Sequence, residues 1–167
     1  MPAERTTVLF NVATPGLLRR DIRAYAKTLE SKVADSRPFC CLITSDQELR
    51  RLNREFRKKD YTTDVLSFPS DGPLGEASRR VGTPQTENPR HIGLGLGEIA
   101  ISFPRAKAQA EEFTHTIANE IEILMLHGVL HLLGLDHESD QGQMARAERK
   151  WRASLGLPNG LIERMRA

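Results

Sequence analysis

Three of the five histidines fall in one short run whose spacing suits a nitrogen-only site for a single divalent metal ion. His127 and His131 are four residues apart, so on a helix their imidazoles project from the same face. Gly134 can end that helix in the left-handed cap conformation at little cost, and the next turn can bring His137 back toward the first pair. The run therefore predicts one zinc ion per chain, held by these three histidines.

Three histidine ligands are typical of a catalytic metal site, because zinc with three protein ligands keeps its fourth position for water and lowers the pKa of that water to near neutrality. Zinc peptidases of the H-E-x-x-H class place a glutamate directly after the first histidine as general base. Here that position is Gly128. The metal ligands are present without the peptidase base, so we expect a different chemistry.

Asp136 precedes the last of the three histidines. We predict that it is a catalytic residue, which either orients a ligand histidine or handles protons. The alternative is an ordinary solvated turn residue, because aspartate is common in turns.

A basic segment lies between residues 50 and 59, where six of ten residues are basic and one, Glu55, is acidic. The six are Arg50, Arg51, Arg54, Arg57, Lys58 and Lys59. The net charge of +2 is too small to indicate nucleic-acid binding by itself, so this local patch carries the signal. A solvated helix face is the alternative interpretation.

The composition is that of a globular protein, with 39% hydrophobic and 28% charged residues. Its 167 residues fit one domain covering residues 1–167. We expect a cytoplasmic protein, since no apolar signal region or membrane span is apparent. Cys40 and Cys41 are adjacent in a strand-like run, where side chains alternate faces, so they are predicted to remain reduced.

Hydrophobic periodicity predicts strands over residues 6–12, 39–44, 64–68 and 96–102. Helices are predicted over 17–33, from Ser45, over 104–113, from Thr116, and over 138–155. The predicted fold class is α+β, with helices packed on a small mixed four-stranded sheet. The metal site is expected on a central buried helix and in the turn after it. Residues 69–95, rich in proline, glycine and charge, are expected to form a mobile loop, either a functional lid or disordered.

Several separated stretches resemble the YbeY family of metal-dependent endoribonucleases that mature ribosomal RNA. The run from His127 to His137 resembles the family signature H-G-x-L-H-L-x-G-x-D-H, including the glycine in the peptidase-glutamate position. The other similar stretches are Asn53, Phe56 and Arg57, Lys59-Asp60, residues 63–69 and residues 97–99. Two features depart from the pattern: Leu135 stands where tyrosine is common, and the segment 69–95 is longer than usual.

The resemblance implies a nuclease for single-stranded RNA that acts in maturation of the 16S rRNA 3′ end and in ribosome quality control. It also implies contact with the small ribosomal subunit and its assembly factors, and it places the essential arginine at Arg57. The chemistry agrees, because zinc and a guanidinium can stabilise the negative charge that phosphodiester cleavage builds on the phosphoryl oxygens. Contact with the RNA backbone is assigned to Arg54, Lys58 and Lys59.

Two other functions stay open from the sequence. A metzincin-like zinc peptidase could draw its base from elsewhere, for example Asp136, and would retain peptide cleavage without Arg57. A non-catalytic ribosome-assembly module could use the metal only to fix its fold, and metal removal would then unfold the chain.

Overall fold

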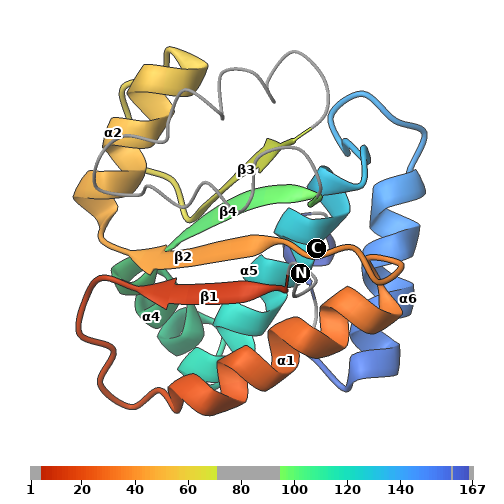
Figure 1. Ribbon diagram of the computed structural model, residues 1–167, viewed down its shortest axis with the longest axis horizontal. Helices are drawn as coiled ribbons and strands as arrows, with labels where there is room; N and C mark the ends of the chain where they lie inside the picture. Colours follow the sequence, from red (N-terminus) through yellow and green to blue (C-terminus); the bar gives the residue numbers. More distant parts are fainter. Residues whose placement is uncertain (1–4, 71–94, 159, 166–167) are drawn as a thin grey trace.

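The computed structural model describes residues 5–70, 95–158 and 160–165, whose arrangement is shown in Figure 1. The strands are β1 (Thr7–Phe10), β2 (Cys40–Thr44), β3 (Val65–Pro69) and β4 (Gly97–Ser102). The helices are α1 (Arg19–Lys32), α2 (Asp46–Arg57), α4 (Phe103–Glu112), α5 (Ile117–Leu132), α6 (Gln143–Leu155) and α7 (Leu161–Met165). Of the loop expected over residues 69–95, the part from 71 to 94 lies outside the described residues.

The sheet has the order β1-β2-β4-β3, with β1, β2 and β4 parallel and β3 antiparallel to β4. This arrangement confirms the predicted α+β class with a small mixed four-stranded sheet. One row of paired residues crosses all four strands: Val8, Cys41, Ile99 and Ser67. Because paired residues point to the same face of a sheet, this row forms a continuous surface for a helix to pack on.

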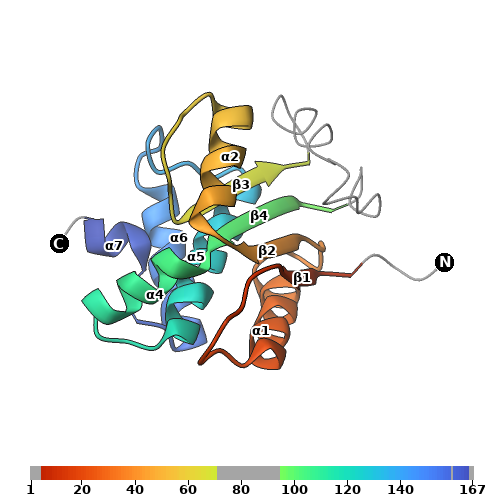
Figure 2. The same ribbon diagram turned by 90° about the vertical axis from the view of Figure 1, so that its left-hand side faces the viewer.

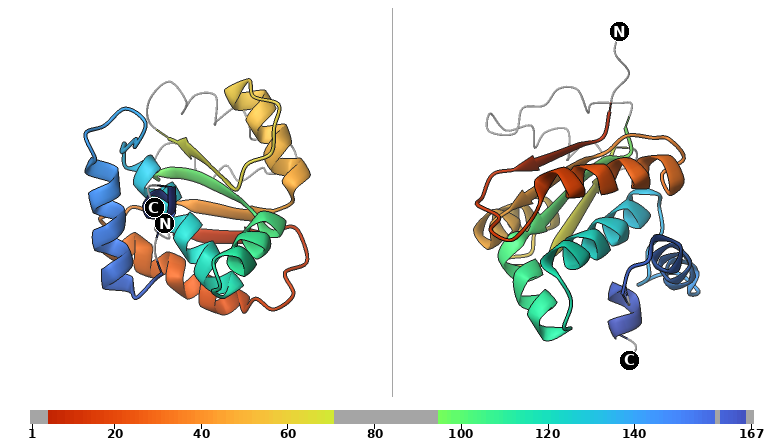
Figure 3. Two further views of the ribbon diagram at one scale, coloured as in Figure 1. Left: turned by 180° about the vertical axis from the view of Figure 1, so that it is seen from behind. Right: turned by 90° about the horizontal axis from the view of Figure 1, so that it is seen from below.

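Helices cover both faces of the sheet, as Figure 2 shows. Helices α1 and α5 lie side by side on one face, a pairing also seen in the right-hand view of Figure 3. Helix α2 packs on the other face, over β3 and β4. The alternation of the strands explains the two layers: Ile99 and Ile101 belong to the core under α5, whereas Leu66 and Ala100 belong to the cluster under α2.

Helix α5 is the central element, and its sequence explains its place. The hydroxyl of Thr116 caps its first turn by accepting a hydrogen bond from the Asn119 amide at 3.0 Å. Eleven of its sixteen residues are buried, which an apolar sequence on nearly all sides predicts. The expected central buried helix is confirmed.

The predicted helix over 138–155 is wrong at its start. Helix α6 begins at Gln143, because the carboxylate of Asp140 accepts hydrogen bonds from the amides of Gly142 and Met144 and so caps the helix there. The residues before it form turns that carry the third histidine. The sequence reading also missed α7, a short helix beyond α6.

Cys40 and Cys41 are both buried and unpaired in the described structure. Burial, with the nearby charge of Glu98, raises the pKa of the Cys40 thiol to about 12, so this cysteine is chemically inert at neutral pH. None of the helices in the described part of the chain has the length and apolar character needed to span a bilayer.

Candidate metal centre

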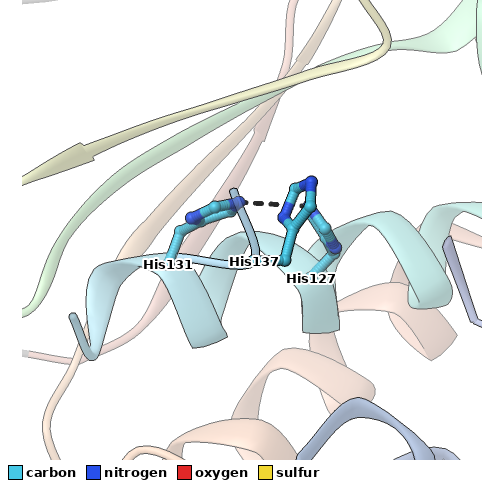
Figure 4. Close-up of side chains that lie close together, drawn as sticks. All are labelled: His127, His131 and His137. Carbon is cyan, nitrogen blue, oxygen red and sulfur yellow. Dashed lines mark hydrogen bonds between the residues drawn. The ribbon is translucent and has the colours of Figure 1, made fainter. Parts of the chain in front are cut away.

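The three histidines converge at the end of α5, and Figure 4 shows their rings facing one another. Each offers one ring nitrogen, and these nitrogens all lie within 4.8 Å of one another. The Nε2 atoms of His127 and His131 are 3.2 Å apart. Two nitrogens bound to one tetrahedral zinc at about 2.0–2.1 Å would be separated by about 3.3 Å. The pair therefore has the spacing that a shared ion requires.

The turn that brings His137 to the pair begins with the capping motif at the end of α5. Gly134 adopts a left-handed φ of 95°, its amide donates to the His131 carbonyl, and the Leu135 amide donates to the Leu130 carbonyl. This is the Schellman pattern, which reverses the chain immediately after a helix. The predicted role of Gly134 as the helix end is thus visible in the backbone.

His127 is held by a residue that sequence reasoning missed. The carboxylate of Glu148, on α6, lies 3.0 Å from His127 Nδ1, and both side chains are buried. A carboxylate oxygen accepts hydrogen bonds, so this contact favours the tautomer that carries its proton on Nδ1 and turns the Nε2 lone pair toward the other histidines. A carboxylate behind a ligand imidazole is the usual outer support of a zinc-binding histidine. The available signal was an acidic residue on the apolar stripe of α6, beside Met144 and Ala145.

The protonation states also suit a metal ion. Burial, with the neighbouring charges of His127 and His137, lowers the pKa of His131 to about 4, so this imidazole is neutral at physiological pH. Neutral imidazole is the form that binds metals. His137 Nδ1 is buried and has no hydrogen-bond partner within the described ranges. An orphaned buried nitrogen in this cluster fits a metal ligand, because buried polar atoms are otherwise almost always satisfied.

The histidines form one wall of a cleft of about 980 Å³. Strand β3 lines the cleft too, as do the end of α2 and the residues after it, which carry Arg57, Lys58 and Lys59. Helices α4 and α7 line the cleft as well, through residues that include Gln109 and Arg164. The cleft therefore joins the candidate metal ligands to three exposed cations from the basic segment.

Arg57 is hydrogen-bonded to β3, the strand that packs beside the helix of the metal ligands. Its Nη2 donates to the Ser67 carbonyl at 3.3 Å, and the Ser67 hydroxyl donates to the Gly128 carbonyl at 3.2 Å. Gly128 directly follows His127, so one serine connects the arginine to the helix of the metal ligands. Ser67 was part of the family-like stretch 63–69, but no sequence rule assigned it this role.

The rest of the basic segment is divided by the structure. Arg50 forms an ion pair with Asp60, and Arg51 forms ion pairs with Glu48 and Glu55. Arg54 is exposed on α2 but does not contribute to the cleft wall. Only the end of the segment, Arg57 to Lys59, reaches the cleft. Asn53, which is buried, supports this end. Its backbone carbonyl accepts a hydrogen bond from the Lys59 amide, and its side-chain Nδ2 donates to the Tyr61 carbonyl.

Asp136 lies in the cleft wall, but its carboxylate is engaged in the turn. It accepts hydrogen bonds from the Glu138 amide at 3.1 Å and from the Ser139 hydroxyl at 3.0 Å. These bonds, together with the nearby His131 and His137, hold its pKa below the ordinary value. The carboxylate is thus ionised, close to two histidines and accessible to solvent, while Glu148 is the carboxylate bonded to a ligand histidine.

Packing explains why the position after His127 is glycine. A Cβ on Gly128 would lie 2.9–3.1 Å from three side-chain carbons of Ile99 on β4. Such a side chain would point into the sheet rather than into the cleft. The peptidase glutamate is therefore not merely absent from the sequence, since the helix has no room for a side chain at this position.

A family model described as endoribonuclease YbeY matches residues 16–156, which include the three histidines, Arg57 and Glu148. The chain belongs to the endoribonuclease YbeY family. A member from Solibacter usitatus is 56% identical over 164 residues, covering 98% of this chain and 97% of the relative. Members from Nautilia profundicola and Helicobacter pylori are 43% and 38% identical over 123 residues, each covering 74% of this chain and about three quarters of the relative.

A similar fold is found among solved structures. A solution structure of a Thermotoga maritima protein matches with a TM-score of 0.53 and 23% identity, covering 89% of this chain and 93% of that protein. At this identity the match concerns the fold alone. It agrees with the mixed sheet and helical layers described above.

Proposed function

We propose that the chain is a single-strand-specific, metal-dependent endoribonuclease that acts in rRNA maturation at the 16S rRNA 3′ end and in ribosome quality control. One observation carries the proposal: a single cleft is lined by three convergent histidines and by Arg57. Membership of the endoribonuclease YbeY family gives the reaction class. The whole chain would act as one catalytic domain.

We infer that the ion is Zn²⁺, bound by His127, His131 and His137. A set of three imidazoles suits zinc, and the Glu148 carboxylate hydrogen-bonds to one of them, as carboxylates usually do behind zinc-binding histidines. When bound, such an ion supplies positive charge that polarises a phosphoryl oxygen and activates water.

The chain's own residues supply the remaining functions. The planar guanidinium of Arg57 would bind the phosphoryl oxygens and stabilise the charge they gain during cleavage. Lys58 and Lys59 would hold the flanking backbone phosphates within the cleft. Arg54, on the exposed face of α2, would contact RNA only where the strand leaves the cleft. Asp136, ionised beside two ligand histidines, is the candidate to accept or relay a proton.

The biological setting follows from the reaction class. An endoribonuclease of rRNA maturation would meet its substrate on the small ribosomal subunit, together with assembly factors. We propose a cytoplasmic location, which agrees with two buried, unpaired cysteines in the described structure.

The decisive experiment is cleavage of an end-labelled single-stranded RNA by zinc-loaded protein, with Arg57→Ala purified in parallel and matched for zinc content. Arg57 is exposed, and its hydrogen bond goes to the Ser67 carbonyl rather than to a histidine or to Glu148, so the variant should keep its zinc. We expect cleavage to fall by roughly 10²- to 10³-fold, the loss typical for a transition-state donor.

Equal cleavage by both proteins would indicate a contaminating nuclease and contradict the proposal. Peptide cleavage that survives loss of Arg57 would favour the peptidase, although the packing of Gly128 against Ile99 argues against it. Binding to ribosomal particles without any cleavage would favour the assembly module.

A further inference from the structure

Glu148 divides its carboxylate between the metal site and the C-terminal helix. Oε2 lies 3.0 Å from His127 Nδ1, and Oε1 accepts a hydrogen bond from the Ile162 amide at 2.8 Å. The side chain of Glu148 is only 1% exposed. A buried carboxylate is tolerated only when both of its oxygens have hydrogen-bond partners. The contact of Glu148 with His127 therefore depends on its contact with Ile162, and the reverse also holds.

A second buried carboxylate fixes the other end of α7. Glu120, in the first turn of α5, accepts from both terminal nitrogens of Arg164 at 2.9 and 3.0 Å. Its side chain is fully buried, and His115 contacts the same carboxylate. The short C-terminal helix is therefore clamped at its start by Glu148 and near its end by Glu120.

Gly160 completes the contact at the start of α7. A Cβ at this position would lie 2.6 Å from Glu148 Cδ and 2.7 Å from Cγ, well inside van der Waals contact. The Glu148 carboxylate cannot easily move away, because both of its oxygens are held by hydrogen-bond partners. A side chain at 160 must therefore displace either the C-terminal segment or the carboxylate behind His127.

We propose that the C-terminal segment from Gly160 to Arg164 supports the metal centre by positioning one of its outer residues, Glu148. By engaging Glu148 it fixes the carboxylate that orients His127, and it thereby raises the affinity of the histidines for a divalent ion. This inference rests on the proposed metal site. The segment lies beyond the family match, which ends at residue 156.

The physical basis is the orientation of one imidazole. With Ile162 docked, Glu148 keeps Oε2 on Nδ1, and Nε2 of His127 stays directed at the other two histidines, where it could bind an ion. If the segment detaches, Oε1 loses its partner, and the carboxylate becomes free to rotate toward solvent. By linkage, an ion that favours the docked arrangement must also tighten the docking of α7.

The first test is Zn²⁺ affinity, measured by competition with a chromophoric chelator, for wild type and Gly160→Ala. We expect a loss of roughly 10- to 100-fold, the effect of disturbing an outer partner of a metal ligand. Arg149→Ala, an exposed neighbour of Glu148 on α6, is the matched control and should bind zinc like wild type. Thermal melts verify that each variant is folded.

A double-mutant cycle tests whether the substitution at Gly160 lowers zinc affinity through Glu148. Glu148→Ala removes the atoms that a methyl at 160 would strike, so adding Gly160→Ala to Glu148→Ala should change zinc affinity little further. Additive losses would mean that Gly160 acts independently of Glu148, and that result would overturn the proposal.

The second test needs no variant. Hydrogen exchange of the Ile162 amide should slow when Zn²⁺ is added to wild type, because that amide donates to Glu148. Unchanged Ile162 exchange together with unchanged affinity in Gly160→Ala would overturn this inference and leave the metal site standing. A wild-type chain that binds no Zn²⁺ would overturn both proposals.

Discussion

The hydroxyl of Ser67 donates a hydrogen bond to the carbonyl oxygen of Gly128, 3.2 Å away, where β3 packs on α5. The carbonyl of the same serine accepts from Arg57 Nη2. The two bonds connect the end of α2 to α5 through one buried residue of β3. The position of the arginine relative to the histidines is therefore set by the packing of a strand on a helix.

Replacing Ser67 with alanine should loosen this connection. We expect the free energy of unfolding to fall by about 1 kcal/mol, the usual net value of one hydrogen bond. RNA cleavage should fall while zinc affinity stays unchanged, because no metal ligand is touched. Urea unfolding, chelator competition and a cleavage assay measure the three effects. Ser31→Ala, on the exposed face of α1, is the control; zinc loss in Ser67→Ala would show that the serine supports the histidines instead.

Gly128→Ala tests the close packing of α5 on β4. Alanine favours a helix by up to about 1 kcal/mol over glycine, but its Cβ would meet Ile99 at 2.9–3.1 Å. Overpacking of this kind costs roughly 1–3 kcal/mol, so we expect a net loss of stability in urea unfolding. In an Ile99→Ala background the same change should cost less. A stabilised Gly128→Ala single variant would contradict the packing argument.

The features that could be predicted from the sequence are those with local causes. Ser45 and Thr116 cap their helices as expected, and Gly134 turns the chain after His131. Each depends on residues within a few positions of one another, so spacing alone identifies it. The histidine cluster is in this class, because two ligands share one helix face and the third follows the cap.

The features that could not be predicted depend on distant pairings. Glu148 meets His127 across two helices, and Ser67 meets Gly128 across a strand and a helix. The basic segment shows the same limit, since Arg50 is engaged by Asp60 only after the chain folds back beyond α2. The sequence shows how many basic residues the segment has, but tertiary contacts decide which of them remain available to RNA.

Lys59→Ala should weaken RNA binding in a salt-dependent way. Each phosphate contact to a single strand contributes about 0.7 to the slope of log affinity against log salt, and we expect the slope to fall by about that amount. Binding is measured by fluorescence anisotropy with metal-free protein, so that the RNA stays intact. Lys27→Ala, exposed on α1, is the charge-matched control. Arg54→Ala should have a smaller effect than Lys59→Ala, and the reverse order would place the RNA path along α2.

Glu122 should make stability depend on pH. Burial, reinforced by the charge of Asp21, raises the pKa of its carboxyl to about 7 from an unfolded value of 4.5. The native state then binds more protons between these values, so its stability is fully present below pH 4.5 and falls as pH rises toward 7.

The Glu122→Gln variant should not lose stability in this way as the pH rises. The variant should be more stable than wild type at pH 8 by about 1 kcal/mol, a value reduced from the full linkage energy because the side chain is partly solvated. At pH 4 the two proteins should unfold alike. Urea titrations at both pH values, with chelator present, provide the comparison. A stabilisation of equal size at both pH values would show that the carboxyl's charge is not the cause.

Asp136→Asn separates the two roles of the residue beside the last histidine. An asparagine oxygen can still accept from the Glu138 amide, so the turn that carries His137 should persist and zinc affinity should stay within about tenfold of wild type. The negative charge and the ability to take a proton are lost. If Asp136 relays a proton, cleavage should fall by roughly 10²-fold or more, and the dependence of rate on pH should change. Cleavage at the wild-type rate with zinc retained would reduce Asp136 to a turn residue.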